Sequence, residues 1–374
     1  MTGPTHWQNA YRRTVRAAQD ATGPVPVLEA AAAELARTVP FELWAGVLLD
    51  PDTLLNVGGV YRHGVGAEWM PRMLDIEYRE GDALQMPALA RSGAAPVGTL
   101  HTGLGGRLER STRYRDIYRP QGLGDEMRVL LRDAGRVWGA LVMVRDAGGP
   151  PFSAAETDLA GRLSAPLGRA LRDSLTAVPG GRDPQARAMV LLSAEYEVLT
   201  TSATARAWFA ELAEVPASGA AGLPATAYGV AAAALRSAGG GCRVCVPTRS
   251  GGWAGIEGWR LEGGSSPQIA LSVGPASPPD RIAALLRAYA LTPRECQVLR
   301  QVLRGASTAQ IATGLALSPL TVQDHLKSVF TKTGVRSRRE LVGQVFFEQY
   351  LPELPPDPSG QCGLRSARSR GTGR

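Results

Sequence analysis

The spacing of apolar residues predicts alternating helices and strands over most of the chain, followed by a run of short helices. Val27–Val39 is rich in Ala and Leu and is predicted to be a helix. Trp44–Leu49 and Val57–Tyr61 are apolar runs of strand length. The N-terminal part is therefore expected to mix helices with a sheet.

A hairpin and a long helix extend this pattern. Met127–Arg132 and Val137–Arg145 are two strand patterns separated by the turn sequence Asp133-Ala134-Gly135-Arg136. After a Gly-Pro breaker, Ser153 and Glu156 form a capping-box signature for a helix. That helix has leucines at every fourth position, namely Leu159, Leu163, Leu167 and Leu171. Residues 25–178 are predicted to form one α/β (α+β) domain.

A second unit is predicted over residues 185–279, after a break between Pro179 and Pro184. Two short strands come first, then two helices, then three further strands. These elements are Val190–Leu192, Val198–Thr200, Ala203–Leu212, Thr226–Ser237, Arg243–Pro247, Gly255–Leu261 and Gln268–Val273.

Helix-start signals recur at short intervals between Leu291 and Val342. Each consists of an N-cap residue with either a capping-box Glu or Gln or a proline at the first helical position. The pairs are Thr292 with Glu295, Ser307 with Gln310, Ser318 with Pro319, and Ser337 with Glu340. Gly305 and Gly334 lie where the first and third helices should end. The spacing predicts four helices of about 8–15 residues with a tight turn, which is typical of a helix-turn-helix.

The third of these helices has one apolar and one polar face. Val322, Leu326, Val329 and Phe330 recur at helical spacing and are predicted to face the core. The opposite face carries Gln323, Asp324, Lys327 and Thr331. Gln can pair with an adenine edge, Asp can accept from cytosine, and Lys can reach guanine or a phosphate. The alternative is a small helical bundle with a solvated polar face.

Positive charge is concentrated at the same end of the chain. Eight basic and three acidic residues between Pro293 and Leu341 give a net charge of +5, against +7 for the whole chain. The remainder upstream is close to neutral. A basic module attached to a neutral body is typical of a DNA-binding protein. Residues 352–374, rich in Pro, Gly, Ser and Arg, are predicted to be a disordered basic tail.

The segment resembles the LuxR-type (NarL/FixJ-type) helix-turn-helix domain of bacterial transcription regulators, over residues 287–351. The resemblance depends on Leu291-Thr292-Pro293-Arg294-Glu295, Ile311-Ala312, Leu317-Ser318, Thr321-Val322, His325-Leu326, Lys332, Gly334-Val335-Arg336 and Arg338. It implies an all-α four-helix domain without a wing, whose helix from about Pro319 to Thr333 is the recognition helix. By the same resemblance, Gln323, Asp324 and Lys327 fall where the family contacts bases. Four more positions fall near phosphate contacts: Thr308, Thr321, Lys332 and Arg338.

Two positions on the reading face depart from the usual pattern of that family. Gln323 stands where many members have lysine, and Asp324 places an acidic group on the face that meets DNA. Asp324 should penalise non-specific binding unless a base or a neighbouring cation compensates it.

The resemblance also implies a dimer contact. The family's dimer helix corresponds to Arg338–Gln349, where Leu341, Val342, Val345 and Phe346 form an apolar stripe. The same stripe can instead close the bundle.

The two upstream units also have resemblances. The first is similar to a GAF-type sensor domain, through its pattern and the run Val137-Trp138-Gly139-Ala140-Leu141 with Pro151-Phe152-Ser153 and Glu156. The second has the element order of a PAS domain. Four aromatic residues of the first unit are candidates either for lining a pocket or for the core: Trp69, Tyr78, Tyr114 and Tyr118. Neither resemblance names a ligand, because function belongs to a site and not to a fold.

Little in the sequence indicates catalysis, a cofactor or a metal. Phosphate-loop, His-Glu-x-x-His and Gly-x-Ser-x-Gly motifs are absent, and the four histidines are scattered. Cys242 and Cys245 have CxxC spacing, but on a strand they point to opposite faces and no second pair completes a zinc site. No secretory or membrane-spanning segment is evident, so a cytoplasmic protein is expected.

The sequence thus predicts a dimeric, non-enzymatic, DNA-binding transcriptional regulator without cofactor or metal. Its partners would be double-stranded DNA, a second copy and an unknown small-molecule effector of the upstream domains. One alternative is a ligand-binding or signalling protein or enzyme whose helical domain mediates protein–protein contact. Another is a redox sensor that uses Cys242 and Cys245.

Overall fold

The computed structural model describes residues 4–93, 95–176, 186–219, 222–237, 241–263 and 266–349, with the side chains of residues 4 and 344–349 left aside. The chain divides into two compact units, with the boundary between Leu291 and Thr292. The first unit contains helices and two sheets, and the second contains helices in its described part. The predicted multidomain architecture, α/β upstream and helical downstream, is confirmed.

The helices and strands keep the order expected from the sequence, with several short additions. The helices of the first unit are α1 (Pro4–Asp20), α2 (Pro24–Ala36), α3 (Met70–Tyr78), α4 (Met86–Arg91), α5 (Leu100–Gly103), α6 (Ala154–Ser174), α7 (Ala205–Glu211), α8 (Ala225–Arg236) and α9 (Pro278–Ala288). The strands are β1 (Leu43–Leu49), β2 (Asn56–Val60), β3 (Val97–Thr99), β4 (Leu123–Asp133), β5 (Arg136–Asp146), β6 (Ala188–Ser193), β7 (Val198–Thr201), β8 (Glu214–Val215), β9 (Cys242–Pro247), β10 (Trp253–Leu261) and β11 (Gln268–Pro275). The second unit contains α10 (Pro293–Leu303), α11 (Thr308–Leu315), α12 (Pro319–Thr333) and α13 (Arg338–Gln349).

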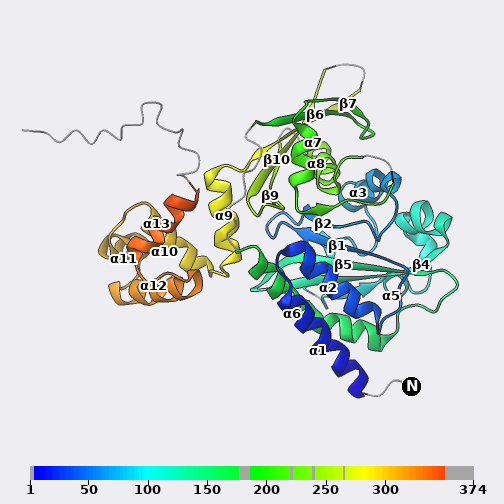
Figure 1. The fold of residues 1–374 in the computed structure, drawn as a ribbon, viewed down its shortest axis with the longest axis horizontal. Helices are drawn as coiled ribbons and strands as arrows, with labels where there is room; N and C mark the ends of the chain where they lie inside the picture. Colours follow the sequence, from blue (N-terminus) through cyan, green and yellow to red (C-terminus); the bar gives the residue numbers. More distant parts are fainter. Residues whose placement is uncertain are drawn as a thin grey trace, which may run out of the picture. The chain divides into compact units, whose positions relative to one another are not determined.

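The larger sheet has the strand order β3-β4-β5-β1-β2-β8. Its strands pair antiparallel except β2 with β8, which are parallel. The predicted hairpin is β4 and β5, and its turn places Ala134 and Gly135 at positive φ (49° and 74°), as a type I′ turn requires. Figure 1 shows α1, α2 and α6 gathered along this sheet.

Close packing of α6 on the sheet depends on a glycine. A Cβ added at Gly168 of α6 would lie 2.5 Å from the backbone carbon of Arg132 on β4. The predicted capping box at the start of α6 is present, since Ser153 accepts from Glu156 N and Ser153 N donates to the Glu156 carboxylate at 2.7 Å.

The first domain was predicted to begin at residue 25. Helix α1, which precedes that residue, packs against α2 and α6.

The smaller sheet has the order β7-β6-β11-β10-β9, and α8 packs against β9, β10 and β11. Strand β8 lies in the sequence of this second part but pairs with β2 of the larger sheet. Its Glu214 side chain accepts from the backbone of Ala225 (2.6 Å) and Thr226 (3.2 Å) at the start of α8. The two parts therefore interlock within one compact unit, while the predicted linker at 179–184 falls outside the described residues.

The CxxC pair lies on β9. Cys242 packs against the core, and Cys245 points to the other face, since Val244 and Val246 alternate with it and are buried. Both thiols are free. Burial raises the pKa of Cys242 to about 11 and that of Cys245 to about 12. Both thiols therefore stay protonated near neutral pH, which disfavours the redox interpretation.

Candidate nucleic-acid interface

Capping chemistry fixes the start of each helix in the second unit. Thr292 and Glu295 form the predicted capping box of α10, and Ser307 and Gln310 form that of α11. Ser318 accepts from Thr321 N (3.0 Å) at the start of α12. At α13 the box is incomplete: Ser337 accepts from Glu340 N, but the Glu340 carboxylate accepts from Arg336 N instead of Ser337 N.

The turn between α11 and α12 has a conformation that the sequence did not indicate. Ala316 ends α11 in the left-handed region, with φ 52° and ψ 50°. Helices more often end on glycine there, because a Cβ is disfavoured at positive φ. The predicted stops at Gly305 and Gly334, with φ 83° and 75°, are confirmed.

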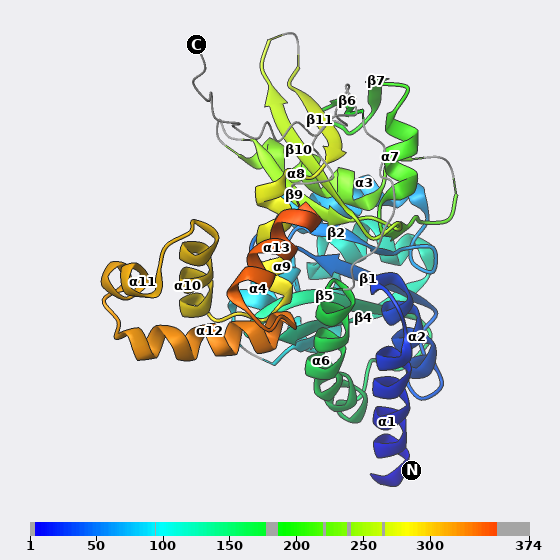
Figure 2. The ribbon, with the colours of Figure 1, turned by 60° about the vertical axis from the view of Figure 1, so that its left-hand side comes forward.

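Helix α12 spans the residues expected for a recognition helix and turns an apolar face inward. Val322, Leu326 and Val329 are buried, whereas Phe330 is only partly buried. The helix packs against α10 and α11, as Figure 2 also shows. Its orientation within this unit is therefore set by burial of that face.

The outward face of α12 brings together the three predicted base-contacting residues. Gln323, Asp324 and Lys327 are all exposed. Lys327 Nζ lies 3.8 Å from Asp324 Oδ1, and their side chains are 77% and 65% exposed. Lys327 is thus a neighbouring cation that can offset the charge of Asp324, although an exposed pair at this distance contributes little to stability.

Sequence reasoning missed one residue of this face. Leu320 is 67% exposed at the start of α12. It lies four residues before Asp324 and seven before Lys327, so the three side chains share one face of the helix. An exposed leucine there can contact a thymine methyl group. Its helical spacing from Asp324 and Lys327 was the available signal.

The predicted phosphate-contacting residues occupy different surroundings from one another. Lys332 Nζ donates to Glu295 Oε2 (2.7 Å), and the Arg338 guanidinium donates to the carbonyl of Ala306. Thr321 Oγ1 shares a hydrogen bond of 2.8 Å with Ser318 Oγ. Thr308 is the first residue of α11 and is partly buried. Lys332 and Arg338 thus both contact their own domain.

Glu295 connects α10 to α12. Its carboxylate accepts hydrogen bonds from Lys332 Nζ (2.7 Å), Ser328 Oγ (2.6 Å) and Thr292 N (2.7 Å). Burial alone would raise the pKa of Glu295, but the hydrogen bonds from Lys332, Ser328 and Thr292 outweigh it and lower the pKa to about 2. The carboxylate is therefore ionised throughout the physiological range and holds α12 against α10.

Further cations surround the domain, and α13 supplies part of the predicted apolar stripe. Four exposed arginines add to its positive charge: Arg300, Arg304, Arg336 and Arg339. Leu341 is buried and closes the bundle, whereas Val342 is 38% exposed. The side chains of Val345 and Phe346 lie outside the described residues.

The sequence profile described as "Bacterial regulatory proteins, luxR family" matches residues 289–345, which include the whole of this arrangement up to α13. Residues 289–345 form a LuxR-family helix-turn-helix domain. The family assignment made from the sequence is confirmed for this part of the chain.

Curated relatives match this chain only over a short stretch. The HTH-type transcriptional regulator MalT of Serratia proteamaculans is 39% identical over 64 residues, or 17% of this chain and 7% of that protein. A putative HTH-type transcriptional regulator of Mycobacterium bovis is 48% identical over 54 residues, or 14% of this chain and 6% of that protein. The chain thus spans only a small fraction of the length of these relatives.

Solved structures give weak overall matches. A GAF domain/HD domain protein from Geobacter sulfurreducens is 20% identical, with a TM-score of 0.30, over 40% of this chain and 93% of that one. The Vibrio cholerae VqmA dimer, described as a LuxR-type receptor, is 18% identical, with a TM-score of 0.16, over 29% of this chain and 53% of that one. Scores this low add nothing to the topology, so the GAF and PAS likenesses stay predictions.

Metal binding and membrane insertion are two further functions on which the described residues bear. Within those residues, no three His, Cys, Asp or Glu side chains are grouped so as to hold a metal ion. None of the helices described is both long and apolar enough to cross a bilayer.

Proposed function

We propose that this protein is a sequence-specific, DNA-binding transcriptional regulator whose LuxR-family domain is modulated by the upstream unit. The observation that carries the proposal is the outward face of α12. Gln323, Asp324 and Lys327 are exposed there, while Val322 and Val329 anchor the opposite face. A helix of this kind fits a major groove and can read base edges.

The charges of the domain support the same proposal. Arg300, Arg304, Arg336 and Arg339 are exposed and can approach phosphates, which sets affinity and register without reading sequence. Thr308, Thr321, Lys332 and Arg338 are proposed to complete the phosphate contacts. For Lys332 and Arg338, these contacts would compete with the hydrogen bonds that they donate to Glu295 and to the Ala306 carbonyl.

Reading a symmetric operator requires a second copy of the domain. We place the dimer contact on α13, Arg338–Gln349, where Val342 is exposed although Leu341 is not. Two recognition helices related by a two-fold axis would then contact half-sites about one helical turn apart.

Helix α9 is the proposed coupling element, since it belongs to the first unit and ends just before the LuxR-family domain. Arg287 of α9 pairs with Asp52 (2.8 Å) and Asp50 (3.4 Å) in the turn between β1 and β2. Arg243 of β9 lies 3.4 Å from Asp280 at the other end of α9. A change in the β1–β2 turn would therefore act on the segment that leads directly into α10.

The test is a binding titration of the full chain with an operator selected from random double-stranded DNA, at fixed salt. Lys327→Ala should weaken binding by about ten-fold and relax the base preference at one position, because a base contact contributes about 1–3 kcal/mol. Arg260→Ala removes the same charge from the exposed end of β10 in the first unit and serves as the matched control. Unchanged affinity and preference in Lys327→Ala would overturn the assignment of α12.

A further inference from the structure

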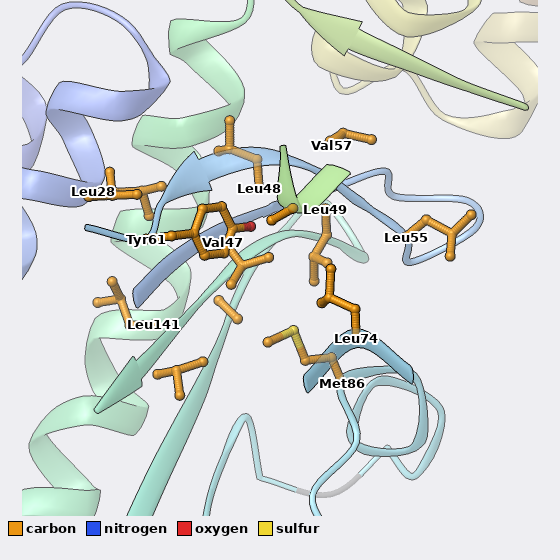
Figure 3. Close-up of a cluster of buried hydrophobic side chains, with 14 of the residues drawn as sticks. Leu28, Val47, Leu48, Leu49, Leu55, Val57, Tyr61, Leu74, Met86 and Leu141 are labelled. Carbon is orange, nitrogen blue, oxygen red and sulfur yellow. The ribbon is translucent and has the colours of Figure 1, made fainter. Parts of the chain in front are cut away.

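The turn between α11 and α12 has few buried side chains to fix its conformation. Apolar contacts hold the helices of the first unit, where Figure 3 shows Leu74 and Met86 extending from α3 and α4 towards the strands of the larger sheet. In the α11–α12 turn, by contrast, Leu315 and Leu317 are only partly buried and Ala316 is exposed. A segment with so little apolar packing has low local stability unless polar contacts support it.

The carbonyl group of Leu315 cannot find its donor within a continuing helix. Leu315 is the last residue of α11. In a longer helix its carbonyl would accept from the residue four positions later, but that residue is Pro319, which has no N–H. The end of a helix also carries partial negative charge, and the last turn of α11 contains no basic residue. A cationic donor from elsewhere in the domain would satisfy both requirements.

Arg294, in the first turn of α10, is that donor. Its Nη2 donates to the carbonyl oxygen of Leu315, although the two residues are 21 apart in the sequence. Its Nη1 donates to Gln297 Oε1 (2.7 Å), one turn later on α10. The side chain is partly buried. Because the planar guanidinium is held by two acceptors of its own domain, it has a fixed orientation towards the α11–α12 turn.

The next residue of α10 contacts the other helix of the helix-turn-helix. Glu295 accepts from Ser328 and Lys332 of α12, whereas Arg294 donates to the end of α11. Two consecutive residues in the first turn of α10 therefore hold the two helices on either side of the turn. Leu320, in the first turn of α12, follows this turn directly, so its position depends on the conformation of the turn.

We propose that Arg294 is a positioning residue for sequence reading: it holds the Leu315 carbonyl, thereby places the first turns of α12 against the base edges, and does not contact phosphate. The inference rests on the proposed function, because the ligand is double-stranded DNA. Arg300 provides the contrast, since it lies on the same helix, is exposed and is proposed to approach phosphates. Loss of Arg294 should therefore affect discrimination between sequences, and loss of Arg300 should affect affinity for every sequence.

The first experiment titrates the full chain with the selected operator and with random duplex DNA of the same length, over a series of salt concentrations. Arg294→Ala should weaken operator binding about three- to ten-fold, the usual effect of one hydrogen bond. Its affinity for random DNA should change by less than about two-fold, because phosphate contacts remain. The slope of log affinity against log salt should stay the same. Base preference should broaden at the base pairs read by the first turns of α12.

Arg300→Ala is the matched control, because it removes the same side chain from the same helix. It should lower affinity for both DNAs alike and reduce the salt slope by about 0.9, the effect of one lost phosphate contact. Its base preference should not change. If Arg294→Ala behaves in the same way, Arg294 is a phosphate contact and the proposal is overturned. An unchanged base preference in Arg294→Ala would overturn it as well.

The second experiment needs no DNA and follows hydrogen exchange of the Ala316 and Leu317 amides, which donate to carbonyls of α11. Exchange should rise about three- to ten-fold in Arg294→Ala and stay unchanged in Arg300→Ala. Should Arg294→Ala fail to fold, Arg294→Lys, which keeps the charge but replaces two donor nitrogens with one, should show a smaller rise. Unchanged exchange in the turn would overturn the role of Arg294. Failure of the wild-type chain to bind any duplex DNA would overturn the proposed function instead.

Discussion

Glu295 and Lys332 join the first turn of α10 to the last turn of α12 through a hydrogen bond of 2.7 Å between Nζ and Oε2. Ser328, one turn earlier on α12, donates to the other oxygen of the same carboxylate. The presentation of Gln323, Asp324 and Lys327 therefore depends on a carboxylate that is itself buried within the domain. Glu295 acts as a positioning residue for the proposed recognition helix.

Replacing Glu295 with Gln should make the domain less stable at neutral pH and less sensitive to acid. The pKa of Glu295 is lowered to about 2 in the folded state, so its ionised form stabilises the fold above the ordinary value of about 4.5. That contribution should disappear as the pH falls from about 4.5 to about 2. Urea unfolding of a fragment starting at Tyr289, followed by circular dichroism at several pH values, measures it.

The control for this prediction is Asp324→Asn, which removes a carboxylate from the exposed face of α12. Its unfolding free energy should stay within about 0.5 kcal/mol of wild type across the same pH range. Glu295→Gln should lose about 1–3 kcal/mol at pH 7 and converge with wild type near pH 2. A constant difference at all pH values would contradict the assigned role of the carboxylate.

The helix boundaries of the C-terminal domain could be predicted because they follow from local chemistry. Ser318 and Pro319 start α12, and Gly334 ends it, so the expected and observed limits coincide. The contact between Glu295 and Lys332 could not be predicted, since it joins residues 37 apart whose proximity depends on helix packing. Lys332 was therefore interpreted only as a phosphate contact.

The upstream unit shows the same division between local and long-range features. Two apolar strand patterns predicted β4 and β5, and the turn sequence Asp133-Ala134-Gly135-Arg136 predicted the hairpin turn. The pairing of β8 with β2 and the ion pairs of Arg287 with Asp50 and Asp52 join segments distant in sequence, and no local pattern encodes them. Ala316 was missed for another reason: alanine gives no sign of a positive φ.

Ala316→Asn should stabilise the helix-turn-helix by a few tenths to about 1 kcal/mol. Asparagine tolerates the left-handed conformation that Ala316 adopts, with φ 52°. Ala316→Val serves as the opposing variant and should destabilise, because a β-branched residue is strained at positive φ. Urea midpoints of the Tyr289 fragment report both changes, and a shift of the two variants in the same direction would contradict the explanation.

Arg287→Ala should loosen α9 without unfolding either unit. The substitution removes the ion pairs to Asp50 and Asp52, of which Asp50 is largely buried. Hydrogen exchange in Pro278–Ala288 should rise about five- to thirty-fold, as expected for the loss of about 1–2 kcal/mol of local stability. Exchange in α12 should stay unchanged. Arg260→Ala, at the exposed end of β10, is the control. Unchanged protection of α9 in Arg287→Ala would argue against α9 as the coupling element.

Asp324→Asn should strengthen non-specific DNA binding and weaken discrimination at one base pair. The Asp324 side chain is 65% exposed, and its carboxylate lies 3.8 Å from Lys327 Nζ, so the two opposite charges partly cancel. Asp324 therefore repels DNA phosphates weakly and also reduces the attraction of Lys327 for them. Removing it should raise affinity for random duplex DNA about two- to five-fold at low salt, with a smaller gain at 0.2 M salt because the effect is screened.

The selected operator should behave differently from random DNA. If Asp324 accepts a hydrogen bond from a cytosine amino group, Asp324→Asn loses about 1–3 kcal/mol at that base pair, which offsets the electrostatic gain. Gln323→Leu, which changes no charge, is the matched control and should lower operator affinity without altering the salt dependence. Equal gains of Asp324→Asn on operator and random DNA would mean that Asp324 only repels the backbone and reads no base.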